Sequence, residues 1–155
     1  MAQKKNWLVP TVIFLLAALL GGVVWYFRDY FEPGPAQVLP LSNCDLHDGP
    51  CTAVLPNGGE VAFSILPRSI PLTKPLKLQV QVKGVKARKV EVDFSGVTMN
   101  MGYNRPRLSA KGEGSFEGEG LLPVCIRQRM DWEAKLMVDT PEGLFIIPYR
   151  FETVK

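Results

Sequence analysis

Histidine, cysteine and recognisable catalytic motifs are scarce in this chain of 155 residues. It has one histidine and three cysteines, and it contains no phosphate-binding glycine loop, no HExxH motif and no CxxC motif. A single histidine excludes a polyhistidine metal centre. No set of nucleophile, base and acid is visible, and the one histidine is not near a serine in the sequence. We therefore predict that the protein is not an enzyme.

Acidic residues are absent before Asp29, whereas Lys4, Lys5 and Arg28 occur there. These three account for the formal net charge of +3, because the other 15 basic residues equal the 15 acidic residues in number. The rest of the chain is neutral and offers no basic stripe for phosphates. We expect no nucleic-acid partner.

Charge is also missing from residues 7–27, WLVPTVIFLLAALLGGVVWYF. An unbroken helix of this stretch would be roughly 31 Å long, against a hydrocarbon core of ~30 Å. Positive charge precedes the stretch, which predicts a cytoplasmic N-terminus. The alternative is a cleaved signal peptide, which has a shorter apolar region and a small-residue cleavage site. We predict a transmembrane helix at residues 7–27 that contacts the lipid bilayer and crosses the bacterial inner membrane once, with residues 1–6 cytoplasmic and the C-terminal domain periplasmic.

After the apolar stretch, residues 28–43 are rich in proline and are predicted to form a spacer, and residues 44–155 one exported domain. Apolar and polar residues alternate at 76–83, 88–94, 132–138 and 144–154, and residues 51–55 and 60–65 flank a hairpin turn. Residues 97–103 and 107–110 are further candidate strands, and no amphipathic helix is indicated. The pattern predicts an all-β fold, an immunoglobulin-like antiparallel sandwich of about 7–8 strands behind the single transmembrane helix.

One predicted strand with alternating apolar and polar residues begins with Trp132. The side chains of Ala134, Leu136 and Val138 should lie on the same face of this strand as Trp132. An inward tryptophan at this position would fill the centre of the sandwich. We predict a structural role for Trp132.

Sulfur is the element that could carry chemistry. Met99 and Met101 lie two residues apart and would share one face of a strand, and Cys125 and Met130 occur together in CIRQRMDW. Thioether and thiolate are soft donors that suit Cu(I). The alternative is that the methionines fill gaps in the core. Met99, Met101, Met130 and Cys125 are the candidate copper ligands.

Cys44 and Cys51 enclose His47 in the loop CDLHDGPC. A local disulfide there would stabilise the fold by roughly 2.5 kcal/mol in the chain-entropy model. The alternatives are a metal or redox site made by the two cysteines and His47, or pairing of one cysteine with Cys125. We predict the disulfide Cys44–Cys51 and keep His47 as a candidate metal ligand.

Four short segments in the second half of the chain carry a resemblance to a known family, and they occur in this order: VTMNMG (97–102), GEGLLPV (118–124), DWEAKLMV (131–138) and YRFET (149–153). The region 90–152 resembles the YtkA-like and FixH-like group of exported domains. The resemblance implies a small β-sandwich that handles Cu(I) and assists assembly of a haem-copper oxidase. Its partners would be an oxidase subunit or another copper chaperone. The alternatives are a non-metal accessory or assembly subunit of a membrane complex, and a thiol-redox protein using Cys44 and Cys51.

Overall fold

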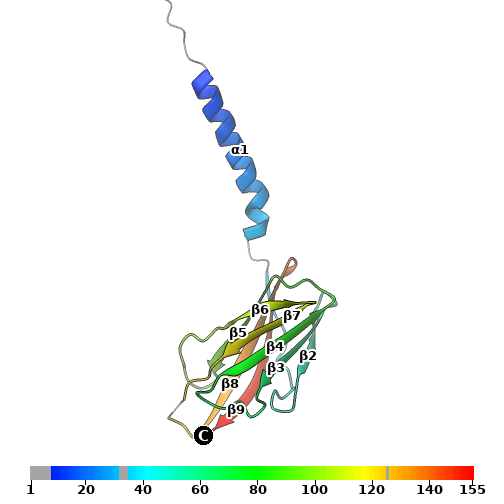
Figure 1. Cartoon of the computed structure of the whole chain (residues 1–155), viewed down its shortest axis with the longest axis vertical. Coiled ribbons are helices and arrows are strands. Elements are labelled where there is room, and N and C mark those ends of the chain that lie inside the picture. The colour runs from blue at the N-terminus through cyan, green and yellow to red at the C-terminus, as the bar shows by residue number, and fades with distance from the viewer. Residues whose placement is uncertain (1–7, 32–34, 125) are drawn as a thin grey trace, which may run out of the picture. The chain divides into compact units, whose positions relative to one another are not determined.

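The computed structural model describes residues 8–31, 35–124 and 126–155, and within the first range it describes the side chains of residues 10–26. The chain divides into two compact units, Met1–Pro33 and Gly34–Lys155, which are considered separately. The first unit contains the helix α1 (Leu8–Phe31), and the described part of the second contains nine strands and no helix (Figure 1).

The prediction of a single-pass membrane anchor at residues 7–27 is contradicted. No helix in the described part of the chain is long and apolar enough to cross a membrane. The localisation in a bacterial inner membrane, which rested on this anchor, is not supported.

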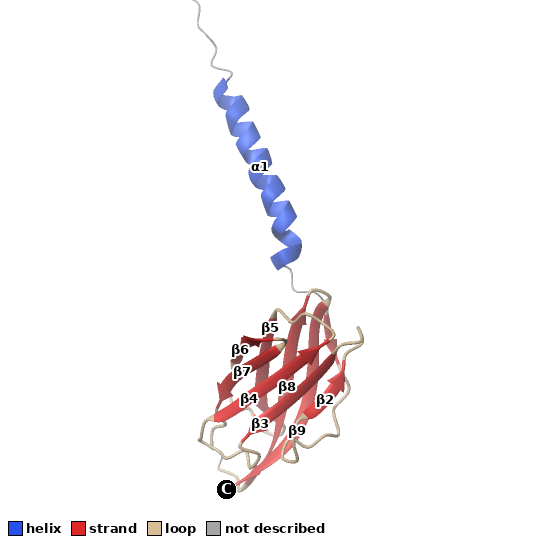
Figure 2. Cartoon of the chain, turned by 45° about the vertical axis from the view of Figure 1, so that its right-hand side comes forward, coloured by secondary structure: helices blue, strands red, loops and turns tan. Residues whose placement is uncertain are grey.

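The second unit is mostly β, as predicted. Its strands are β1 (Ala36–Val38), β2 (Cys51–Val54), β3 (Glu60–Leu66), β4 (Leu76–Lys83), β5 (Lys89–Gly96), β6 (Arg107–Gly112), β7 (Ser115–Gly120), β8 (Arg129–Thr140) and β9 (Gly143–Val154). They form one mixed sheet in the order β1-β9-β8-β5-β6-β7-β4-β3-β2, in which β1 runs parallel to β9 and the other neighbours are antiparallel. The sheet curls, so that β2 and β3 come round towards β9 (Figure 2).

The concave side of this curled sheet holds the core. Alternate residues of β4, β5, β8 and β9 are buried, as the two-residue period of their sequences predicts. Phe63 of β3 lies against Tyr149 of β9 with ring centroids 5.6 Å apart, although these strands are far apart in the sheet order. The two ends of the sheet therefore share a single apolar interior.

The predicted proline-rich spacer begins the sheet instead of standing apart from it. Residues 36–38 form β1 on β9, and the chain stays beside β9 as Leu39 N–H donates to the Ile146 carbonyl at 2.8 Å and Ser42 N–H to the Pro148 carbonyl at 3.1 Å. The edge of β9 offers unpaired carbonyls, and an extended proline-rich segment can satisfy them.

Residues 97–103, expected to form a strand, lie instead in a loop between β5 and β6. Gly102 has a φ of 79°, and its N–H donates to Asn100 Oδ1 at 2.9 Å, which makes a local turn. Short side-chain turns of this kind compete with the ladder of a sheet. The shared strand face predicted for Met99 and Met101 is therefore wrong.

Candidate functional site

The side chains of Met130 and Met101 and the backbone of Met99 lie beside the end of β5. Its last residue, Gly96, lies directly opposite Trp132 on β8. A Cβ added at Gly96 would lie 2.4 Å from Met130 Cε, 2.4 Å from the Met99 carbonyl oxygen and 3.3 Å from Met101 Cγ. The space that a side chain would occupy at Gly96 is thus filled by two thioether side chains, one from β8 and one from the loop after β5.

The sequence explains this arrangement. Every second residue of β5 faces inward, and Gly96 is the last of these. On β8, Met130 comes two residues before Trp132, so both side chains lie on the inward face of that strand. The loop is held over the end of the sheet because Val97 N–H donates to the Asp131 carbonyl at 3.0 Å. Glycine in a strand often marks a close approach of other atoms, and Gly96 is the residue that the sequence-based prediction missed.

Burial differs among the three methionines. Met130 is 4% exposed and belongs to the core, whereas Met99 and Met101 are half-buried and pack against the core from the loop. We name Met99, Met101, Met130 and Gly96 the methionine cluster. Met130 and Met101 contribute side-chain atoms to the space beside Gly96, and Met99 contributes its backbone carbonyl.

Harder ligands are not gathered into such a group. Within the residues that the structure describes, no three histidine, cysteine, aspartate or glutamate side chains converge in a way that could hold a metal ion. Cys125, the fourth candidate copper ligand, lies outside the described residues. The side chains that the described structure brings together beside Gly96 are those of Met130 and Met101.

His47 is engaged elsewhere. Its Nδ1 lies 2.6 Å from the Arg68 carbonyl oxygen, and its Nε2 lies 2.9 Å from the Glu152 carbonyl oxygen. Because both ring nitrogens face backbone oxygens, neither has a lone pair directed at open space. The contacts that fix the His47 ring are therefore with the backbone of two other segments.

Cys44 and Cys51 lie at disulfide-bonding distance, as predicted, with their sulfurs 2.03 Å apart. Cys51 is 0% exposed and is the first residue of β2, and Cys44 is half-buried. A disulfide with one fully covered residue at the edge of a sheet is suited to fixing the loop, and exchange with a partner thiol needs an accessible sulfur.

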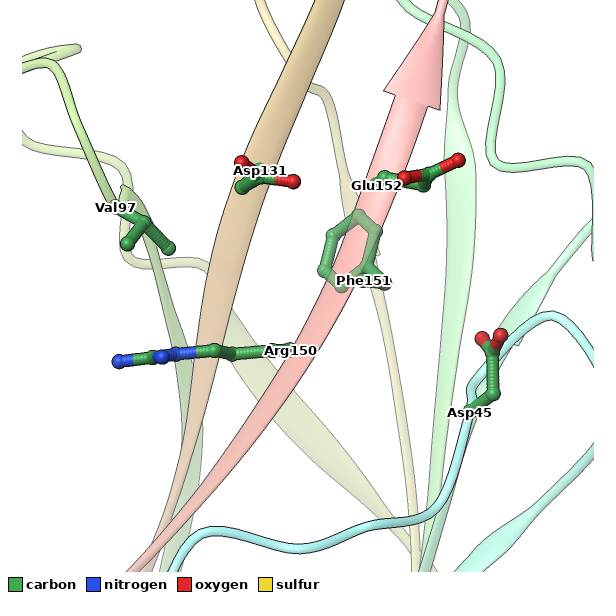
Figure 3. Close-up of a pocket in the computed structure, with 6 residues that line it drawn as sticks. All are labelled: Asp45, Val97, Asp131, Arg150, Phe151 and Glu152. Carbon is green, nitrogen blue, oxygen red and sulfur yellow. The ribbon is translucent and has the colours of Figure 1, made fainter.

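A separate open depression of about 440 Å³ lies over the ends of β8 and β9. Its lining residues are Asp45, Val97, Asp131, Arg150, Phe151 and Glu152 (Figure 3). Two of its four charged residues take part in ion pairs, since Arg150 Nε lies 3.1 Å from Glu133 and Glu152 pairs with Arg129. We find no nucleophile and base together among these lining residues.

Tyr149 carries a buried hydroxyl in the core. The residue is fully buried, and among the described residues its oxygen has no hydrogen-bond partner. Burial disfavours the charged phenolate and raises the pKa of Tyr149 to about 12. The hydroxyl therefore costs stability at neutral pH and costs more in strong alkali.

Tyr149→Phe is expected to raise the free energy of unfolding by about 1 kcal/mol at pH 7, because it removes a buried polar group that lacks a partner. A raised pKa in the folded state means that stability is complete below the unfolded value near 10 and is lost as the pH rises towards 12. Relative to the variant, the unmodified protein should lose a further ~1.4 kcal/mol by pH 11. Urea unfolding of both proteins at pH 7 and pH 11 measures this, and parallel pH profiles would contradict it.

No protein family, curated protein or solved structure was found to match this chain.

Proposed function

We propose that this protein binds Cu(I) through the thioethers of Met99, Met101 and Met130 and passes the ion to a haem-copper oxidase subunit or another copper chaperone. The observation that carries the proposal is the filling of the Gly96 position by Met130 and Met101, together with the Met99 backbone. Side chains from β8 and from the loop after β5 thereby come within a few ångströms of one another.

The chemistry of the donors favours copper over harder ions. Thioether sulfur is neutral and needs no deprotonation, and it prefers Cu(I) to Zn(II), Mg²⁺ or Ca²⁺. Met99 and Met101 are half-buried and Met130 is buried. We infer that an ion would enter and leave past Met99 and Met101, as a protein that passes its metal on requires.

The remaining parts of the proposal rest on the resemblance of residues 90–152 to the YtkA-like and FixH-like domains. We infer from it that the curled sheet is an immunoglobulin-like sandwich and that the copper is destined for oxidase assembly. The opposition of β3 and β9 across one core is consistent with a sandwich, because face-to-face sheets share their interior.

The copper site is tested by anaerobic titration of the purified chain with Cu(I) against a chromogenic chelator. The unmodified protein is expected to bind one Cu(I), and Met101→Leu combined with Met130→Leu should abolish binding. The fold should survive, because Leu for Met nearly conserves volume and costs under ~1.5 kcal/mol. Met99→Leu and Cys125→Ala, made in parallel, test the other two candidate ligands.

Met137→Leu is the matched control. Met137 lies on the same strand, β8, but at a half-buried position on the opposite face from Met130. It should bind Cu(I) like the unmodified protein. Equal binding by the double variant and the control would show that the methionines are only core residues, and the proposal would fail.

A further inference from the structure

The interior of the curled sheet opens to the surface at the end where β5 begins. The register of β5 and β6 consists of two pairs, Val90 with Leu108 and Glu91 with Arg107. Beyond Leu108, β6 continues beside β7 and leaves β5. Ala110 is two residues after the buried Leu108 and shares its face of the strand, yet Ala110 is exposed. An inward-facing part of β6 is therefore left without a covering strand.

The uncovered face lines an open groove of about 680 Å³, which we name the lateral groove. One wall is the turn after β4, with Val85 and Ala87, and the other wall is the β6–β7 hairpin, with Ala110. Val82 and Phe116 also line the groove, and both belong to the core. The lining is mainly apolar, and the volume lies within the range of roughly 300–1,000 Å³ that is usual for small-molecule sites.

The hairpin wall of the lateral groove is held in place by β4. Glu113 and Gly114 at its tip have φ values of 52° and 74°, as a tight hairpin turn with two left-handed residues requires. Gln81 Nε2 donates to the Glu113 carbonyl at 2.8 Å, and Val82 N–H donates to the Gly114 carbonyl at 2.8 Å. A wall that is fixed in this way reduces the conformational entropy that binding would cost.

Two lysines lie in the other wall. Lys83 ends β4 and Lys86 follows in the turn, and both are exposed. The next cations along the chain, Arg88 and Lys89, are held in ion pairs, whereas neither Lys83 nor Lys86 forms one within the part of the chain that the structure describes. Glu113 lines the hairpin wall, so the charged residues of the groove are two cations on one wall and one anion on the other.

We propose that the lateral groove binds a fatty-acid anion, whose alkyl chain lies against Val85, Ala110 and Phe116 and whose carboxylate lies at Lys83 and Lys86. A small hydrophilic anion would leave the apolar walls uncovered, and a neutral apolar molecule would leave the two cations unpaired. An alkyl carboxylate satisfies both, since burial of its chain supplies affinity and its charge fixes its direction in the groove.

This site is separate from the methionine cluster. Ala87 of the lateral groove precedes β5, whereas Gly96 of the methionine cluster is the last residue of β5. The two sites therefore lie at opposite ends of the same strand and share no residue. The proposal does not depend on copper binding.

The proposal is tested by ¹⁵N NMR of the full chain, titrated with decanoate below its micelle concentration at pH 7.5. The amide signals of residues 82–87 and 110–116 are expected to shift and to saturate with one ligand per chain. Decanol, which has the same chain length and no charge, should shift the same signals with lower affinity, because it cannot pair with the lysines.

Variants separate the charge from the apolar wall. Lys83→Gln combined with Lys86→Gln should weaken decanoate binding about fivefold and leave decanol binding unchanged, because two exposed ion pairs are lost. Lys77→Gln combined with Lys135→Gln makes the same change of net charge outside the groove lining and should bind decanoate like the unmodified protein. Ala110→Phe should weaken both ligands at least about tenfold, because its ring occupies the groove.

Three results would overturn the proposal. One is a set of shifts confined to α1, which would place the alkyl chain on the exposed apolar side chains of that helix. Another is equal decanoate affinity in the two lysine double variants. The third comes from sedimentation: an unmodified chain that is dimeric and that Ala110→Phe makes monomeric would show that a second copy covers the groove.

Discussion

Replacing Trp132 by alanine is expected to lower the free energy of unfolding by roughly 3–5 kcal/mol. Trp132 is 0% exposed, and its Nε1–H donates to Thr153 Oγ1 at 3.0 Å in the core. The substitution leaves a large cavity and also leaves a buried hydroxyl without its donor, and each effect costs stability. Urea denaturation followed by far-ultraviolet circular dichroism measures the change without relying on tryptophan fluorescence.

Two further variants separate the causes. Trp132→Phe keeps much of the volume but loses the hydrogen bond, so it should cost clearly less than alanine. Trp25→Ala is the matched control, because Trp25 lies in α1 and is 76% exposed. It should leave the unfolding of the β unit unchanged. A loss below ~1 kcal/mol for Trp132→Ala would show that Trp132 does not fill the core.

The sequence predicted best those strands that have one buried face. The alternation of residues 76–83 coincides with β4, and the alternating segments at 132–138 and 144–154 form the middle of β8 and most of β9. In each case apolar residues recur every second position because one face of the strand is buried and the other is not. Trp132, placed inward on the same argument, is indeed fully buried.

The sequence failed where the contacts are not local. β7 (Ser115–Gly120) was not predicted, because its glycines resemble breaks and it has one large apolar residue, Phe116. In the structure those glycines allow close packing, since a Cβ at Gly118 would lie 3.1 Å from Leu108 Cγ. Similarly, β1 exists because β9 lies beside it, and nothing within residues 36–38 signals that partner.

The positions of the methionines follow only in part from the sequence. Met130 does lie inward beside Trp132, as strand alternation required. Met101 lies near Met130 because a loop, and not a strand, carries it there. That position depends on the turn at Gly102 and on Gly96, whose missing side chain leaves room for both methionines. The contacts of His47 could not be read from the sequence, because the carbonyls that engage it come from residues 21 and 105 positions away in the chain.

Removing the disulfide with Cys44→Ala and Cys51→Ala is expected to destabilise the protein by about 2.5 kcal/mol in the chain-entropy model. The bond closes a short loop, with a sequence separation of 7, so its effect on the unfolded chain is moderate. Burial of Cys51 makes alanine preferable to serine, which would bury a hydroxyl. The melting temperature should fall by roughly 10 °C, measured by differential scanning calorimetry.

Cys125→Ala is the control, and it also tests the alternative pairings, because it removes the third thiol and leaves Cys44 and Cys51 in place. Peptide mapping without reduction should find the 44–51 linkage unchanged in this variant, and its melting temperature should stay near that of the unmodified protein. Reducing the unmodified protein should reproduce the loss seen in the double variant, since both break the same covalent constraint. A loss in Cys125→Ala as large as in the double variant would mean that Cys125 takes part in the stabilising bond.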